Sequence, residues 1–176
     1  IKREGTPVVW TLYDCWAFTG HCSYFDDIVC DKWTKHCSKC PKSNKYPKSF
    51  FDNSYNNFDL KKKVFNSLDN LEIIAHSRWL QGLIKRSFLG KNIVHVTPSA
   101  VNLQEFKPVD SDLRNRFKIE SKKIILGCAS TWSDRKGLND FLELNQKLDS
   151  NLYQIVLIGL SKKQINDLSS NIIGIT

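Results

Sequence analysis

The sequence contains no methionine, not even at position 1. This absence indicates a chain that was trimmed or that forms part of a longer one. No apolar run approaches the roughly 18 residues that a membrane-spanning helix needs. The first five residues, IKREG, are mostly charged and are not followed by the apolar stretch of a signal peptide. The sequence itself therefore contains neither a membrane-spanning run nor a signal-peptide pattern.

The two commonest glycine-rich nucleotide-binding patterns are also missing. The expected strand-to-helix turn at 127–137, GCASTWSDRKG, matches neither GxxxxGK[ST] nor GxGxxG. It does offer the hydroxyl group of Ser130, the cationic side chains of Arg135 and Lys136, and the small Gly137. Helix amino termini bind phosphate through unpaired N–H groups, and a nearby Lys or Arg adds charge-assisted bonds. The turn is a candidate phosphate site, with a plain polar loop as the alternative.

The composition is that of a globular protein with a basic surface. Hydrophobic residues make up 41% of the chain, enough to form a real core, and the formal net charge is +8. A positive charge attracts polyanions, which include nucleic acid, an anionic membrane surface and phosphorylated small molecules. A solvated basic face without a partner is the plainer alternative.

Short apolar strands alternate with helices in two series, separated by the proline-bounded linker 98–108. This alternation predicts parallel βα units, and hence an α/β fold with two Rossmann-like domains, residues 1–103 and 104–176, both incomplete. In the first series, the helix 57–68 is expected to be an amphipathic surface helix, with Leu60, Val64 and Leu68 on its apolar face and Phe65 beside them. The expected strands are 7–12, 71–75, 92–97, 123–128, 153–158 and 172–175, and the expected helices are 57–68, 78–88, 111–117, 136–148 and 161–168.

A long loop rich in cysteine and aromatic residues, residues 15–47, follows the first strand. Loops of this length are usually functional or disordered, and the aromatic content argues against disorder. Four cysteines follow the pattern C-x7-C-x6-C-x2-C, at Cys22, Cys30, Cys37 and Cys40. They could hold a structural zinc ion, pair as disulfides or remain free thiols. With four thiolate ligands, zinc would have no open position and would not be catalytic.

Other histidines and cysteines have simpler interpretations. His21 and His36 each adjoin a loop cysteine and could replace one sulfur ligand. Cys15 and Cys128 lie at strand ends and are expected to be small core residues. His76 and His95, next to or within apolar strands, are expected to be core histidines with satisfied hydrogen bonds.

Several stretches together resemble a known family. These are TLYDCWAFTGHC from Thr11, the spaced cysteines with Trp33, CPKSNKYP from Cys40, AHSRWLQ, EFKP, and LGCAS followed by W-x-DRKGL. In this order they resemble family 4 glycosyltransferases of the GT-B fold, in particular those of colanic-acid and O-antigen biosynthesis. The resemblance covers most of the chain.

The resemblance implies retaining, hexosyl-type sugar transfer from a nucleotide-sugar to a cell-surface polysaccharide such as lipopolysaccharide, or to a lipid-linked glycan. It assigns residues 1–103 to the acceptor side, with Asp14 and Tyr13 as catalytic candidates, although the family has His where this chain has Tyr13. Residues 104–176 become the donor side. The candidates for binding the donor diphosphate there are Lys136, Arg135 and Ser130.

The resemblance also implies a cytoplasmic location, peripheral contact with an anionic membrane, no cofactor for catalysis and no nucleic-acid partner. The family's glycine at the linker is absent here, where the chain reads SAVN at 99–102. The family's E-x7-E element and its first glycine-rich loop would lie beyond the two ends. We therefore expect a central fragment, inactive alone. The competing hypothesis is a zinc-stapled basic module that binds single-stranded nucleic acid through its aromatic loop.

Overall fold

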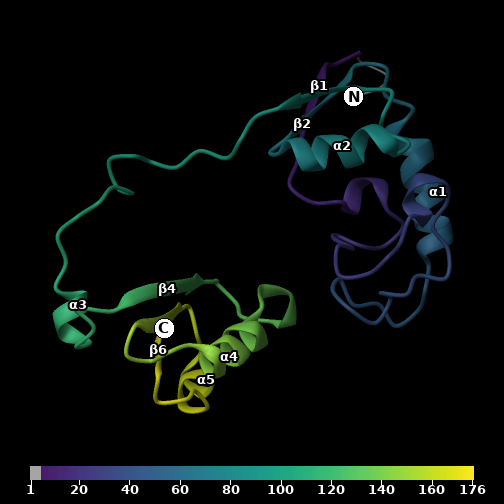
Figure 1. Ribbon diagram of the computed structural model, residues 1–176. Coiled ribbons are helices and arrows are strands. Elements are labelled where there is room, and N and C mark those ends of the chain that lie inside the picture. The colour runs from purple at the N-terminus through teal and green to yellow at the C-terminus, as the bar shows by residue number, and fades with distance from the viewer. Residues whose placement is uncertain (1–4) are drawn as a thin grey trace. The chain divides into compact units, whose positions relative to one another are not determined.

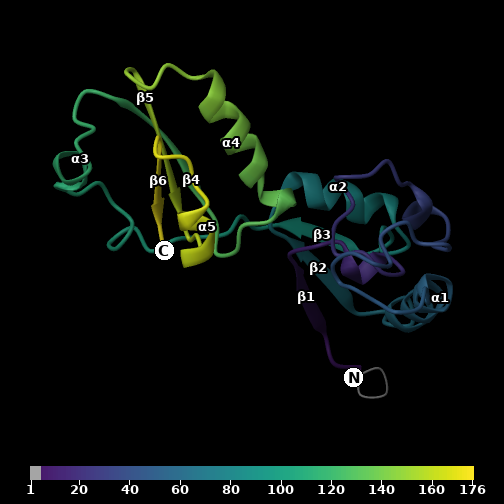
Figure 2. The same ribbon diagram turned by 90° about the horizontal axis from the view of Figure 1, so that it is seen from below.

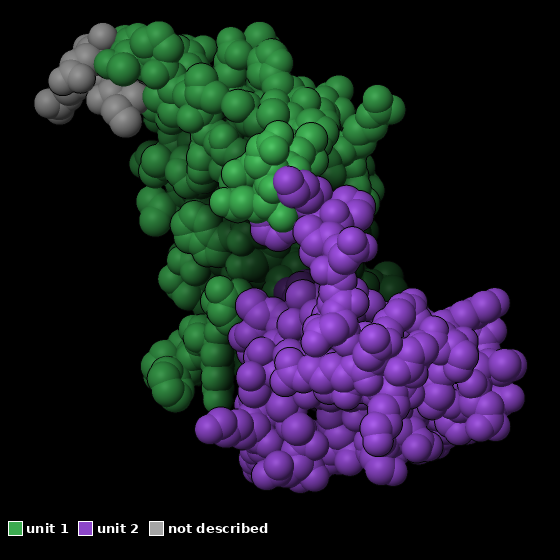
Figure 3. All heavy atoms as spheres, turned by 90° about the vertical axis from the view of Figure 1, so that its left-hand side faces the viewer, with its two compact units in different colours: residues 1–105 green, residues 106–176 purple. Residues whose placement is uncertain are grey.

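The computed structural model describes residues 5–176. It divides the chain into two compact units, the first ending at Glu105 and the second running from Phe106 to Thr176 (Figure 3). Each unit contains one three-stranded parallel sheet, ordered β1-β2-β3 in the first unit and β4-β5-β6 in the second (Figure 1). The α/β class is confirmed, and the two sheets are compatible with Rossmann-like halves.

The strands agree with the sequence expectation to within a residue, whereas the helices differ more. Helix α1 begins three residues earlier than expected, because Asp52 Oδ1 accepts the backbone N–H of Ser54 at 2.9 Å and starts the first turn. The strands are β1 (Val8–Leu12), β2 (Leu71–Ala75), β3 (Ile93–Val96), β4 (Lys123–Cys128), β5 (Tyr153–Ile158) and β6 (Ile172–Ile175). The helices are α1 (Ser54–Phe65), α2 (Arg78–Arg86), α3 (Leu113–Arg116), α4 (Leu138–Lys147) and α5 (Lys162–Asn166), with 3₁₀ turns η1 (Trp16–Phe18), η2 (Lys32–Thr34) and η3 (Asp134–Lys136).

One face of the first sheet forms the core of unit 1. Ile73 and Ala75 of β2 are fully buried and pack in one cluster with Leu80 and Ile84 of α2, which runs beside the sheet (Figure 2). Successive strand residues point to opposite faces of a sheet, so Ile74, next to Ile73 and Ala75, lies on the opposite face together with its partner His95. There His95 is exposed, and its Nε2 lies 2.8 Å from Glu72 Oε2. The expectation that His95 is a core histidine is therefore wrong.

Helix α1 presents a different face to the core than its apolar spacing indicates. Leu60 and Val64 are 60% and 47% exposed, whereas Phe58 and Lys61 are buried. The Lys61 Nζ atom donates hydrogen bonds to the carbonyl oxygens of Trp16 at 2.7 Å and Thr19 at 3.0 Å. Burial lowers the pKa of Lys61 to about 8. Phe65 and Leu68 pack against the core as expected, but the expectation is wrong for Leu60 and Val64. The cysteine loop supplies the surface against which α1 packs, and this surface includes carbonyl groups that need a donor.

Unit 2 is built around its central strand, β5. Ile155 and Leu157 are buried together with Ile172 of β6, and helix α4 packs Phe141 and its neighbouring leucines against them. Gly127 of β4 faces this core, so the next residue, Cys128, points to the opposite face and is exposed. The expectation of a buried Cys128 is wrong, whereas Cys15 is buried as expected.

Candidate functional site

Polar side chains gather where β1 and β2 end in unit 1. Tyr13 and Asp14 follow β1, His76 follows β2, and these parallel strands pair in register. The Tyr13 ring is 68% exposed and stacks on the His76 ring, with centroids 5.3 Å apart. Asp14 is exposed, and its Oδ1 accepts the backbone N–H of Trp16 at 2.9 Å. The carboxyl edge of a parallel sheet is the usual ligand-binding edge, so this cluster is a candidate ligand site.

His76 is the residue of this cluster that sequence reasoning missed. It is half-buried, its Nδ1 lies 3.4 Å from the Leu12 carbonyl oxygen, and its ring covers part of Tyr13. It is therefore a strand-end residue beside Tyr13 and not the core histidine that was expected. The signal in the sequence is its position directly after an apolar strand predicted to be parallel to β1.

A hollow of about 480 Å³ opens between the cysteine loop and the exposed face of α1. Its wall includes the indole of Trp16 and the side chains of Leu60 and Val64, which explains why that face of α1 is apolar. Polar residues also line it, among them His21, Lys48, Ser49 and Asn57. Trp16 lies two residues after Asp14, and its backbone N–H is bound by the Asp14 carboxylate, so the hollow adjoins the strand-end cluster.

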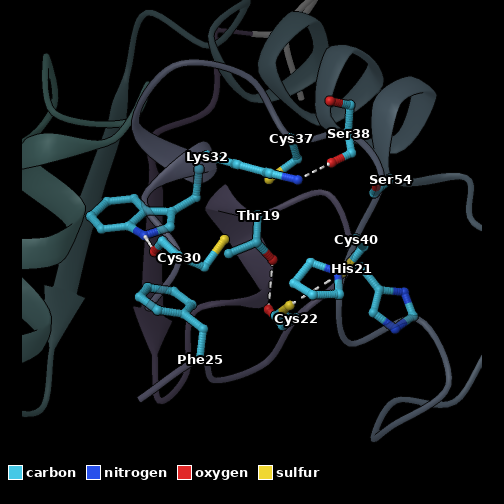
Figure 4. A pocket seen from close by; sticks show the side chains of 12 residues that line it. Thr19, His21, Cys22, Phe25, Cys30, Lys32, Cys37, Ser38, Cys40 and Ser54 are labelled. Atoms are coloured by element: carbon cyan, nitrogen blue, oxygen red, sulfur yellow. Dashed lines mark hydrogen bonds between the residues drawn. The ribbon is translucent and has the colours of Figure 1, made fainter. Parts of the chain in front are cut away.

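The four loop cysteines line one small cavity of about 20 Å³ (Figure 4). The Sγ atoms of Cys22 and Cys40 lie 3.7 Å apart, and all four cysteines are free thiols. Within residues 5–176, no group of three or more His, Cys, Asp or Glu side chains is already arranged to hold a metal ion. The His21 ring also borders the cavity, and its Nε2 is buried without a hydrogen-bond partner in the described part of the chain.

The environment of the thiols differs from one cysteine to the next. Burial raises the pKa of Cys22 to about 12, and the neighbouring Cys40 and Cys37 act in the same direction. Burial also raises the pKa of Cys37. A hydrogen bond from the backbone N–H of Gly20 lowers this pKa, but by less. Cys22 and Cys37 are therefore protonated at neutral pH in the metal-free protein.

Aromatic packing orders the same loop. The Trp33 ring is buried and contacts the rings of Phe18 and Phe25, with centroids 5.6 and 5.2 Å away. Lys42 is 1% exposed, and its Nζ donates to Asp27 Oδ1 at 2.5 Å and to the Tyr24 carbonyl oxygen at 3.2 Å. The hydrogen bond from Lys42 lowers the pKa of Asp27.

In unit 2, a hollow of about 360 Å³ lies at the carboxyl ends of β4, β5 and β6. Its wall contains Ser130, one of the three predicted donor-site residues. Arg135 and Lys136 are exposed on η3 and do not line it. Helix α4 begins at Leu138, after Gly137 at φ 74°, so Lys136 immediately precedes the turn into the helix. The remaining lining residues are Thr131, Trp132, Gly159, Leu160, Ser161, Gln164 and Thr176.

Comparison with known proteins gives one informative similarity. Over 66 residues, 38% of its length, the chain is 36% identical to an Escherichia coli (strain K12) protein named "Putative colanic acid biosynthesis glycosyl transferase WcaC". The matched stretch covers 16% of that protein, so this chain spans only a small part of its length. No protein-family model matches the chain, and no solved structure matches it. The local similarity supports the broad class of glycosyltransferases.

Proposed function

We propose that the chain is a segment of a retaining, hexosyl-type family 4 glycosyltransferase of the GT-B fold. The reaction would transfer a sugar from a nucleotide-sugar to a lipid-linked glycan or to a cell-surface polysaccharide such as lipopolysaccharide. The observation that carries the proposal is the 66-residue similarity to a protein named as a glycosyl transferase. The two parallel sheets are compatible with the two Rossmann-like halves that such an enzyme needs.

The acceptor would bind at the strand-end cluster of unit 1. An exposed aromatic ring such as Tyr13 offers a flat apolar face to a sugar ring, and Trp16 offers another in the wall of the adjoining hollow. The carboxylate of Asp14 has capacity beyond its bond to the Trp16 N–H, because its two oxygens offer about four lone-pair positions. We assign Asp14 to the reacting hydroxyl of the acceptor, and Tyr13 with His76 to the positioning of the sugar.

The donor diphosphate would bind at the start of α4. The first N–H groups of α4 have no side-chain cap, and the chain enters the helix through Gly137 in the left-handed conformation. Lys136 and Arg135 bring positive charge to this helix start, and Ser130 contributes a hydroxyl group from the end of β4. Backbone donors together with cationic side chains are what a diphosphate requires.

Replacing Lys136 with alanine in the full chain should weaken binding of uridine or guanosine diphosphate by roughly 10- to 150-fold. This range corresponds to the loss of one hydrogen bond to a charged group, about 1.5 to 3 kcal/mol. Titration calorimetry with both nucleotides measures the change. Lys147→Ala is the matched control, because Lys147 is exposed at the opposite end of α4 and should leave the affinity unchanged. Equal affinities in Lys136→Ala and the unmodified protein would contradict the assignment.

The same titrations test the class of protein. A glycosyltransferase segment should bind a nucleoside diphosphate, and added single-stranded oligonucleotides should not displace it. If single-stranded oligonucleotides bind instead, with an affinity that falls steeply as salt rises, the proposed function is wrong.

We also propose peripheral contact with the cytoplasmic face of a membrane. No helix in residues 5–176 is long and apolar enough to cross a bilayer. The formal charge of +8 supports adsorption to anionic lipid, since each Lys or Arg near such a surface contributes about 1 kcal/mol. Cosedimentation with phosphatidylserine vesicles is therefore expected at low salt and should disappear near about 0.5 M salt, where the screening length is only a few ångströms. Equal binding to neutral vesicles would contradict an electrostatic contact.

A further inference from the structure

We infer that the cysteine loop binds one zinc ion through the Sγ atoms of Cys22, Cys30, Cys37 and Cys40. The ion would be structural, because four protein ligands leave no position for water or substrate. The inference is independent of the proposed transferase activity, since it rests on the loop alone.

The first argument is that the four thiols share one enclosure of the right size. All four cysteines line the same cavity of about 20 Å³, although they are spread over nineteen positions of a loop (Figure 4). A cavity needs at least about 10–15 Å³ to hold a single water molecule, so this one admits a single small occupant. Thiols that were merely core residues would have no reason to converge on one space from three separate segments of loop.

The second argument is the separation of Cys22 and Cys40. Tetrahedral zinc with Zn–S bonds of about 2.3 Å places its sulfur ligands about 3.8 Å apart. The two Sγ atoms are 3.7 Å apart, whereas a disulfide requires about 2.05 Å. This pair is already at ligand spacing. Cys30 and Cys37 complete the site by moving inward, because no set of three ligands is assembled yet in residues 5–176.

The third argument is the turn that joins Cys37 to Cys40. Lys39 between them has a φ of 47°, a left-handed conformation that is unfavourable for a lysine. Three hydrogen bonds hold this turn: Lys32 Nζ donates to the carbonyl oxygens of Ser38 and Lys39, both at 3.0 Å, and Asp52 Oδ2 accepts the Cys40 N–H at 2.8 Å. Backbone strain that the surroundings maintain is typical of binding sites. Here it keeps two cysteines three positions apart on one tight turn beside the cavity.

The charge around the cavity suits a zinc tetrathiolate, which carries a net charge of −2. Lys32 lines the cavity, and Lys42 and Lys61 both act electrostatically on Cys22. On binding, each thiol releases its proton to solvent as its sulfur forms a bond to Zn²⁺. Four S–H bonds are lost and four Zn–S bonds form, with no change of oxidation state. The ion would tie the segment after η1 to the turn before α1.

The test is a metal titration of the full chain, purified in reductant and stripped with a chelator. We expect one Zn²⁺ per chain, and Co²⁺ substitution should give the intense sulfur-to-metal charge-transfer absorption of four thiolate ligands. Cys22→Ser and Cys40→Ser should each lower the affinity by more than about 100-fold, because even the loss of an outer-shell partner costs 10- to 100-fold. Cys128→Ser, exposed in unit 2, is the matched control and should bind normally.

Two results would overturn the inference. The first is a reduced, unmodified chain that binds no zinc, or whose Co²⁺ complex lacks thiolate absorption. That measurement needs no variant, so it stands even if Cys22→Ser fails to fold. The second is a disulfide between Cys22 and Cys40 in mass spectra of the protein isolated without reductant under an inert atmosphere.

Discussion

Replacing Gly20 with alanine should destabilise unit 1 by about 3 kcal/mol or more, the upper part of the range for overpacking a closed site. Gly20 is buried, and a Cβ atom there would overlap the carbonyl oxygen of Ser54 and lie 2.8 Å from the Cβ of Cys37. Neither neighbour is the end of a flexible side chain, so the backbone of the loop or of the first turn of α1 must move. Equilibrium unfolding in urea, followed by tryptophan fluorescence, measures the change.

Gly82→Ala is the control for this substitution. Gly82 lies inside α2, and a Cβ added there meets nothing within 4 Å. Alanine should therefore stabilise the helix by about 0.5 to 1 kcal/mol, because glycine is the poorer helix former. The same substitution, glycine to alanine, is thus expected to lower the stability of unit 1 at position 20 and to raise it at position 82. Equal stability of Gly20→Ala and the unmodified protein would show that the loop does not pack closely against α1.

The strands could be predicted from the sequence because each is a short, mostly apolar run. Their parallel pairing followed from the helices between them. The exposure of individual strand residues could not be predicted, since it depends on which face is covered. His95 and Cys128 show this, because both belong to apolar strands but point to the open face of their sheets.

The face of α1 was mispredicted for a related reason. Leucine and valine at a spacing of four residues normally indicate the buried side of a helix. The loop places the carbonyl oxygens of Trp16 and Thr19 against this helix, so the buried position is taken by Lys61, whose Nζ can satisfy both. No local pattern in residues 54–65 reveals acceptors that lie some forty positions earlier.

The candidate sites were predicted unevenly. The positions of Tyr13 and Asp14 followed from the end of the first strand, whereas the spacing of the loop cysteines left a zinc ion, disulfides and free thiols open. His76 could be placed beside Tyr13 only once the register of β1 and β2 was known. The roles assigned to Asp14, Tyr13, Lys136, Arg135 and Ser130 stay predictions, and the last experiment addresses the most consequential of them.

Asp14→Asn in the complete enzyme of which this chain is proposed to be a segment should lower kcat/KM for the acceptor by about 100-fold or more, the range for losing a group that receives a proton at the reacting atom. The asparagine keeps an oxygen that can accept the Trp16 N–H, so the turn after β1 and the stability of the fold should be preserved. The substitution removes only the negative charge that we assign to the reacting hydroxyl of the acceptor. Sugar transfer measured at varied acceptor concentration, together with urea unfolding, separates the two effects.

Asp69→Asn supplies the comparison, because Asp69 is exposed just before β2, at the opposite end of the same sheet. It changes the net charge by the same amount but should leave transfer unaffected. Asp14→Ala should lose activity as well as about 1 kcal/mol of stability, because the hydrogen bond to Trp16 is also lost. If Asp14→Asn retains full activity while Asp14→Ala is merely less stable, the carboxylate only caps the turn. The reacting hydroxyl must then be bound by another side chain, and His76, stacked on Tyr13, is the next to test.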